Sequence, residues 1–152
     1  MWRLKYRWFV LVVGAAALAL LAGCVSGGAK RVVTALHEAV RDGDREKALD
    51  LLGGGADLNA QDENGLTALH YTATNGEVGL AEALLAAGAD PNIQNDNGDT
   101  PLHMAARNDF DGIVEALLAG GADKSIENAG GQTAADVAEE IGAQDVLELL
   151  AH

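Results

Sequence analysis

The amino-acid sequence repeats itself every 33 residues, and this period constrains the fold more than any other feature of the chain. A string that begins with threonine opens each copy, and a Gly-Ala-Asp string and a leucine recur with the same step. The threonine strings are Thr34-Ala35-Leu36-His37, Thr67-Ala68-Leu69-His70, Thr100-Pro101-Leu102-His103 and Thr133-Ala134-Ala135-Asp136. The other two sets begin at Gly55, Gly88 and Gly121, and at Leu51, Leu84, Leu117 and Leu150. We therefore expect a stack of similar units, because no single unit can bury its apolar face alone.

Each copy reads as two short helices. The threonines are placed as helix N-caps, and Pro101 follows one of them at the first helical position, where a missing N–H costs nothing. Gly43, Gly76 and Gly142 are placed to end the first helices, with Asp109 at the equivalent position of the third copy. The second helices carry the side chains expected in the core: Leu49, Leu51, Leu52, Leu80, Leu84, Leu85, Ile113, Val114, Leu117, Leu118, Val146, Leu147 and Leu150. Between copies, Asn64-Gly65, Asn97-Gly98 and Gly130-Gly131 predict two-residue hairpin turns.

This pattern resembles the ankyrin repeat, whose signature is a Thr-Pro-Leu-His element that opens a helix pair. The resemblance covers residues 32–152, and the copy that starts at Thr100 matches best. It implies an all-α ankyrin-repeat solenoid of about four helix pairs joined by β-hairpin-like loops, with repeats at 32–61, 62–94, 95–127 and 128–152. The first copy has Val32 where later copies have a hairpin glycine, and the last has Asp136 in place of histidine. Such departures suit end repeats, which face water on one side.

The first 23 residues predict a signal peptide that is removed. Residues 1–7 carry three cations, residues 8–22 carry no charge, and Gly23-Cys24 follows. Leu21-Ala22-Gly23-Cys24 resembles the lipobox of bacterial lipoproteins, in which the cysteine becomes the first mature residue and carries acyl chains. The resemblance implies lipidation at Cys24, a lipid-anchored linker over residues 24–31, and stable membrane attachment.

An uncleaved membrane anchor is the alternative for the same segment. Residues 8–25 are eighteen residues long, and about 18 to 20 apolar residues can span a bilayer. Either form places the body outside the cytoplasm, because the cations at the start stay inside. By resemblance to lipoproteins of two-membraned bacteria, Val25 after the cysteine favours the periplasmic side of the outer membrane over the inner membrane. We therefore expect the protein in the bacterial cell envelope.

The chain is strongly acidic, with 10 Lys and Arg side chains against 23 Asp and Glu side chains and a formal net charge of −13. Affinity for nucleic acid comes largely from cations that release counterions from phosphates. DNA and RNA are therefore excluded as partners. The acidity suits a basic protein partner, although solubility alone also explains it.

The sequence offers no constellation for catalysis or metal binding. His37, His70 and His103 fall on successive repeats, roughly 10 Å apart by helix packing distance, whereas zinc needs nitrogens about 2.0 to 2.1 Å from one ion. By resemblance, these histidines hydrogen-bond the helix start to a neighbouring loop. Ser26 and Ser125 are the only serines and do not belong to any Ser-His-Asp pattern. We expect no enzyme activity, no metal and no cofactor.

Residues that vary between repeats, while the repeat frame stays constant, mark a candidate binding surface. Ankyrin proteins, by resemblance, hold partners on a concave side lined by hairpin tips and first helices. The predicted protein-binding residues are Leu66, Tyr71, Thr74, Asp99, Met104 and Arg107. Tyrosine, methionine and arginine are enriched at interfaces, although Tyr71 and Met104 would also simply cover the helix face.

These features together predict a monomeric, non-catalytic protein–protein interaction module held at the envelope by lipid. One function that fits is a scaffold or assembly factor for an envelope protein. The alternative is an inhibitor of the immunity type that neutralises an envelope-acting enzyme or toxin, to which the acidic body would steer a basic partner. A third function is a structural lipoprotein without a specific partner. The sequence does not identify the partner.

Overall fold

A computed structural model describes residues 34–152, and within that range the chain forms eight α-helices and no strand. The helices are α2 (Ala35–Arg41), α3 (Arg45–Gly53), α4 (Ala68–Asn75), α5 (Val78–Ala86), α6 (Pro101–Arg107), α7 (Asp111–Ala119), α8 (Ala134–Ile141) and α9 (Gln144–Ala151). The predicted all-α solenoid of four helix pairs is confirmed. The predicted signal peptide, Cys24 and the linker over residues 24–31 lie outside the described residues.

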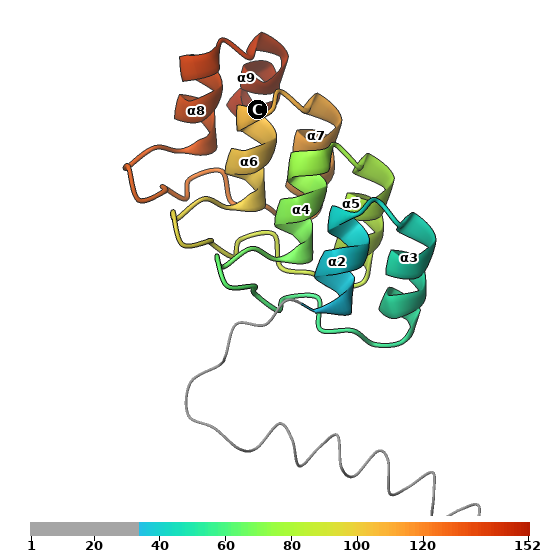
Figure 1. The fold of residues 1–152 in the computed structure, drawn as a ribbon. Coiled ribbons are helices and arrows are strands. Elements are labelled where there is room, and N and C mark those ends of the chain that lie inside the picture. Colours follow the sequence, from blue (N-terminus) through green and yellow to red (C-terminus); the bar gives the residue numbers. More distant parts are fainter. Residues whose placement is uncertain (1–33) are drawn as a thin grey trace, which may run out of the picture. The chain divides into compact units, whose positions relative to one another are not determined.

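The helices form two layers (Figure 1). The first helices of the pairs, α2, α4, α6 and α8, pack side by side in chain order, and the second helices, α3, α5, α7 and α9, do the same behind them. Long loops connect one pair to the next and lie together at one edge of the stack. None of the described helices is long and apolar enough to cross a membrane.

Threonine N-caps start all four first helices, as predicted. Thr34, Thr67, Thr100 and Thr133 have extended backbones, and the side chain three residues later reaches back to each of them. In α4 the backbone N–H of Thr67 donates to His70 Nδ1 at 3.0 Å. In α8 an aspartate takes the place of the histidine, and the N–H of Thr133 donates to Asp136 Oδ2 at 2.7 Å. These bonds satisfy donors that a helix start otherwise leaves without partners.

The first helices end where the sequence predicts. Gly76 and Gly142 are left-handed C-caps of α4 and α8, with φ of 75° and 80°. Asp109 follows α6 with φ of 56°, and it is the one non-glycine residue with positive φ in the described part of the chain. This conformation costs an aspartate more than a glycine. At Gly76 a side chain would also meet the Phe110 ring, which lies 3.3 Å from the position of a Cβ atom.

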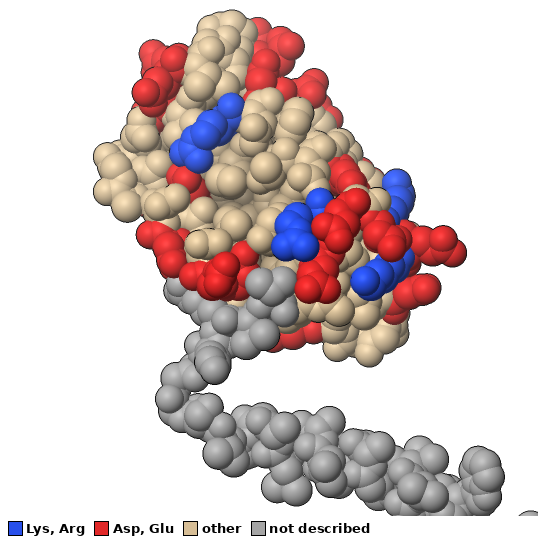
Figure 2. Space-filling view, viewed as in Figure 1, with Lys and Arg blue, Asp and Glu red and all other residues tan. Residues whose placement is uncertain are grey.

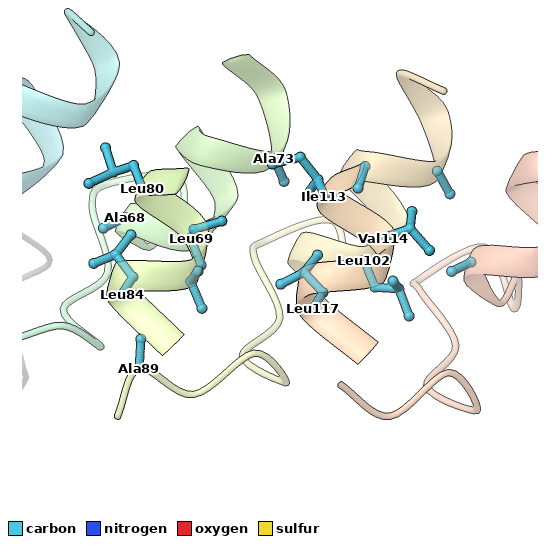
Figure 3. Packing of buried hydrophobic residues seen from close by; sticks show 14 of the residues in the cluster. Ala68, Leu69, Ala73, Leu80, Leu84, Ala89, Leu102, Ile113, Val114 and Leu117 are labelled. Atoms are coloured by element: carbon cyan, nitrogen blue, oxygen red, sulfur yellow. The ribbon is translucent and has the colours of Figure 1, made fainter. Parts of the chain in front are cut away.

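The core runs between the two layers and along the whole stack. Leucine, isoleucine, valine and alanine side chains from all four pairs fill it, and Figure 3 shows those of the central repeats, Leu69, Leu80, Leu84, Leu102, Ile113 and Leu117 among them. Alanines such as Ala73 and Ala105 are fully buried, so neighbouring helices approach closely. Each pair therefore depends on its neighbours for most of its buried surface.

The prediction that Leu49 lies in the core is wrong. Its side chain is 40% exposed, and the equivalent positions one, two and three repeats later hold the exposed residues Glu82, Glu115 and Glu148. This register position points away from the core in every repeat. Leu51, Leu52, Leu85, Leu118 and Leu147 are only partly buried and pack against the margin of the core.

The prediction of two-residue turns between repeats is also wrong. In the first of these loops the N–H of Asp62 donates to the carbonyl of Leu66 at 2.9 Å, and the N–H of Gly65 donates to the carbonyl of Asp62 at 3.0 Å. Three residues therefore lie between the closing pair, and only the third, Gly65, has positive φ. The loops at Asn95 and Asn128 have the same bonds, with Gly98 and Gly131 at the third position.

Candidate functional site

The three repeated histidines hold the repeats together by hydrogen bonds and are not arranged as a binding or catalytic site. His70 is fully buried, and its Nδ1 accepts the N–H of Thr67, so the proton lies on Nε2, which donates to the carbonyl of Asp99 at 3.0 Å. Burial lowers the pKa of His70 to about 4, because the protonated ring would lose its hydration inside the protein. His37 and His103 make the equivalent bonds to the carbonyls of Leu66 and Gln132. The predicted bonds between helix starts and neighbouring loops are confirmed.

No group of three or more His, Cys, Asp or Glu side chains within residues 34–152 is arranged to hold a metal ion. Each of the buried histidines already uses both ring nitrogens in hydrogen bonds.

Tyr71 is a residue of α4 whose hydroxyl is hydrogen-bonded to the buried carboxylate of Asp62. Its hydroxyl donates to Asp62 Oδ2 at 2.7 Å, and its ring meets the His37 ring edge-on with centroids 5.9 Å apart. Burial raises the pKa of Tyr71 to about 12, and the bond to Asp62 adds to the rise. The hydroxyl therefore bonds within the protein, and the exposed part of the partly buried ring is what a partner could touch.

Asp62 is buried because its carboxylate organises a loop as well as Tyr71. Its Oδ1 accepts the N–H groups of Asn64 and Leu66 at 2.9 and 2.8 Å. Burial alone would raise the pKa of Asp62, but the bonds from Tyr71, Leu66 and Asn64 outweigh it and leave the pKa below its ordinary value.

Arg107, at the end of α6, is held by a second buried carboxylate. Its Nη1 and Nη2 donate to the two carboxylate oxygens of Asp99 at 2.9 and 3.3 Å, and Nη1 lies 3.7 Å from the sulfur of Met104. Asn128 Nδ2 donates to the same carboxylate at 3.0 Å. Burial would raise the pKa of Asp99, yet the bonds from Arg107 and Asn128 lower it below the ordinary value. The Arg107 side chain remains 44% exposed.

The structure places the six predicted binding residues differently in exposure. Asp99 is only 3% exposed, so its carboxylate supports Arg107 and does not itself offer a surface. Leu66 is partly buried, and Thr74 is exposed but donates its hydroxyl to the carbonyl of His70 at 2.9 Å. Arg107 is exposed, whereas Tyr71 and Met104 are partly buried like Leu66. Hydrogen bonds to buried carboxylates fix Tyr71 and Arg107 among the predicted residues.

Sequence reasoning missed Asp62 and Asn128, which fix Tyr71 and Asp99 from the loops. One signal was available: Asp62, Asn95 and Asn128 are 33 residues apart, and all three are side chains that can accept N–H bonds from their own loop. In each loop the Oδ1 atom of this residue does accept two backbone N–H groups. The 33-residue period does not predict the bond between Asp62 and Tyr71 or the bond between Asn128 and Asp99.

The exposed and partly buried side chains on the outward face of α2, α4, α6 and α8 together form what we call the inner-helix surface. Its centre, over α4 and α6, consists of the exposed residues Thr74, Asn75, Arg107 and Asn108 and the partly buried residues Tyr71 and Met104. Figure 2 shows this face as a mostly uncharged area with acidic side chains around its edge. The second helices carry further exposed acids, among them Glu82, Glu115 and Glu148.

A family model for ankyrin repeats in three copies matches the chain over residues 36–128 and again over 77–152. No curated protein matches the chain.

Proposed function

Because the chain belongs to the ankyrin-repeat family, whose stacked repeats bind other proteins, we propose that it is a lipid-anchored scaffold that holds one envelope protein on its inner-helix surface. Ankyrin-repeat proteins are generally non-catalytic interaction modules. A scaffold needs no catalytic groups and only a binding surface, such as the one described above.

One observation carries the choice of surface. Two buried carboxylates, Asp62 and Asp99, hold two surface side chains, Tyr71 and Arg107, on neighbouring repeats. Burying a carboxylate is costly unless it is fully hydrogen-bonded, and both of these are. Side chains that are already fixed lose little conformational entropy when a partner binds, which favours affinity.

The first experiment captures the partner on the full chain. The protein is expressed with its leader in a bacterium, cross-linked in the intact envelope, and purified beside two variants. Tyr71→Ala with Arg107→Glu alters the inner-helix surface, whereas Glu82→Ala with Glu115→Ala alters the second helices as a matched control. We expect one protein to be retained by the native chain and by the control variant but lost from the inner-surface variant. Equal retention by all three would refute the choice of surface.

The anchor is part of the same proposal, and its support is the sequence of residues 1–25. We propose that residues 1–23 are removed, that Cys24 carries acyl chains, and that residues 24–31 link it to the repeats of residues 32–152. Mass spectrometry of the purified chain would then find an acylated Cys24 as the first residue. A Cys24→Ser chain would keep its leader and carry no acyl group. A native chain that keeps residues 1–23 without acylation would instead support the uncleaved anchor.

The location follows from the anchor and is proposed with it. We expect the repeats in the periplasm, on the outer membrane in preference to the inner membrane. Separation of the two membranes followed by immunoblotting distinguishes the two locations.

An inhibitor of the immunity type remains the second candidate, and one observation favours it. Residues 34–152 hold five Lys and Arg side chains and all 23 Asp and Glu side chains of the chain. Such a body attracts a basic enzyme or toxin and accelerates its binding. The captured partner's activity, measured with and without the full chain, separates the candidates, because an inhibitor abolishes it and a scaffold leaves it unchanged or raises it.

A further inference from the structure

Met104 is the one methionine among residues 34–152, and it lies at the centre of the inner-helix surface. Its side chain is partly buried and packs against the margin of the core. The thioether of methionine is a common target of oxidants. Met104 is therefore the methionine that an oxidant meets on the folded repeats.

The neighbours of Met104 place a fixed hydrogen-bond donor beside its sulfur. Arg107 Nη1 lies 3.7 Å from the sulfur and also donates to Asp99 Oδ2 at 2.9 Å. The carboxylate of Asp99 is buried and accepts further bonds from Arg107 Nη2 and from Asn128. This guanidinium nitrogen carries two hydrogens, so one N–H remains for Met104 after the bond to Asp99 is made.

The combination of methionine, arginine and aspartate at these positions occurs in the third repeat alone. The residues equivalent to Met104 in the other repeats are Glu38, Tyr71 and Val137. The pair that corresponds to Asp99 and Arg107 is Leu66 and Thr74 one repeat earlier, and Gln132 and Glu140 one repeat later. The repeat frame therefore does not require this group of three side chains.

Oxidation would turn the sulfur of Met104 into a group that suits this donor. A thioether is a weak acceptor, whereas a sulfoxide is polar. An S–O bond of about 1.5 Å followed by a hydrogen bond of about 2.9 Å spans the 3.7 Å between Met104 Sδ and Arg107 Nη1 when the angle at oxygen is about 110°. Such an angle suits an oxygen lone pair. The new polar group would be hydrogen-bonded without displacement of either side chain.

We propose that hydroperoxides oxidise Met104, that Arg107 holds the resulting sulfoxide, and that the sulfoxide weakens binding of the partner. The last of these claims rests on the function proposed above. In the reaction, the sulfur lone pair attacks one oxygen of the hydroperoxide, the O–O bond breaks and an S–O bond forms. The other oxygen leaves as water or an alcohol and takes the proton of the transferred oxygen. The sulfur loses two electrons, and the hydroperoxide gains them.

The first test follows the transferred oxygen atom. The full chain in detergent micelles is treated with hydrogen peroxide, either folded or unfolded in concentrated urea. Peptide mass spectrometry measures how fast Met104 gains one oxygen atom. We expect the folded chain to react within about tenfold of the rate of the unfolded chain, because the side chain is only partly buried. Stronger protection in the folded chain would overturn the oxidation site.

The second test asks whether Arg107 holds the sulfoxide. The urea midpoint of the native chain and of Arg107→Ala is measured before and after oxidation, with circular dichroism as the check of folding. We expect oxidation to lower the midpoint of Arg107→Ala more than that of the native chain, because only the native sulfoxide has its donor. Met104→Leu with Leu49→Met moves the methionine to an exposed position on α3, and oxidation should leave its midpoint unchanged. Equal shifts in the native chain and Arg107→Ala would overturn the role of Arg107.

The third test measures the effect on binding with the cross-linking capture described above, in cells exposed to hydrogen peroxide before cross-linking. We expect the native chain to retain its partner about tenfold less after exposure, because a polar oxygen then lies in the contact. A Met104→Leu chain should retain the same amount with and without peroxide, which controls for oxidation of the partner itself.

The outcomes separate this proposal from the proposed function. Equal retention by the native chain before and after oxidation of Met104 overturns the effect on binding and leaves the scaffold standing. If the untreated chain retains no partner that depends on Tyr71 and Arg107, the proposed function fails, and the effect on binding fails with it. The mass and urea measurements decide the oxidation site in either case.

Discussion

At the scale of single residues, the polar groups of the binding surface are mostly occupied within the protein. The hydroxyl of Tyr71 is bonded to Asp62, that of Thr74 to the carbonyl of His70, and the guanidinium of Arg107 to Asp99. What remains for a partner is the ring of Tyr71, the side chain of Met104 and the free edge of Arg107. These are rigid contacts with few polar groups left to satisfy.

Replacing Tyr71 by phenylalanine separates the roles of its hydroxyl and its ring. Tyr71→Phe leaves Asp62 with two of its three hydrogen bonds, so we expect the free energy of unfolding to fall by about 1 to 2 kcal/mol. Retention of the cross-linked partner should change little, because the ring stays. Tyr71→Ala should lower both stability and retention. Urea denaturation and the cross-linking capture measure the two effects, and a Phe variant that loses the partner would show that the hydroxyl does face it.

His70 makes stability depend on pH. Its pKa is about 4 in the folded protein and near 6.5 in the unfolded chain, so between these values the unfolded chain binds more protons. The stabilisation is therefore complete above about pH 6.5 and falls as the pH is lowered towards about 4, by about 3 kcal/mol in total. Urea denaturation at a series of pH values checks this. If the free energy of unfolding of a folded His70→Gln variant changes with pH to the same extent, groups other than His70 cause the dependence.

At the scale of the elements, the loops between helix pairs are joined to one another as well as to the helices. The N–H of Asp96 donates to the carbonyl of Asn64, and the N–H of Ala129 to that of Asn97, each at 3.0 Å. Gln94 Nε2 adds a bond to the carbonyl of Glu127 at 2.9 Å. Successive loops thus form a continuous hydrogen-bonded edge beside the core.

Two glycines with nearly the same backbone conformation test the importance of this edge. Gly98 and Gly131 have φ of 75° and 74°, so replacing either glycine by alanine introduces about the same backbone strain. A Cβ atom at Gly98 would lie 2.5 Å from the backbone nitrogen of Ala129, whereas at Gly131 nothing lies within 4 Å. We expect Gly98→Ala to lower the free energy of unfolding by at least about 1 kcal/mol more than Gly131→Ala. Equal losses in urea denaturation would show that loop contact contributes nothing.

Among the elements, the sequence predicted correctly those features that depend on residues close together in the chain. The threonine caps and the helix ends at Gly76 and Asp109 depend on residues within one turn, and they are where the period places them. The turn length was wrong because the side chain of Asp62 captures two N–H groups and closes a longer loop. The bond between Asp99 and Arg107 could not be predicted, because the equivalent pair one repeat earlier is Leu66 and Thr74, which cannot form it.

At the scale of the whole described chain, like charges repel one another. Residues 34–152 hold 23 acidic and five basic side chains, and repulsion among exposed acids opposes the compact state. Salt screens this repulsion, with a Debye length of about 30 Å at 0.01 M and about 8 Å at 0.15 M. We therefore expect the thermal midpoint of the full chain to rise between about 10 mM and about 0.3 M sodium chloride. A midpoint that stays constant or falls in calorimetry would show that favourable ion pairs such as that of Arg107 dominate.

The bond from each histidine to the carbonyl of the following loop means that the repeats are not independently exchangeable. His70 belongs to the second repeat, yet it positions the backbone of Asp99, whose side chain holds Arg107 in the third. A substitution buried in one repeat can therefore alter recognition by the next. Recombination that moves a single repeat would carry the surface residues away from the core residue that positions them. Adjacent repeats, and not single ones, are the smallest unit that could transfer a binding specificity.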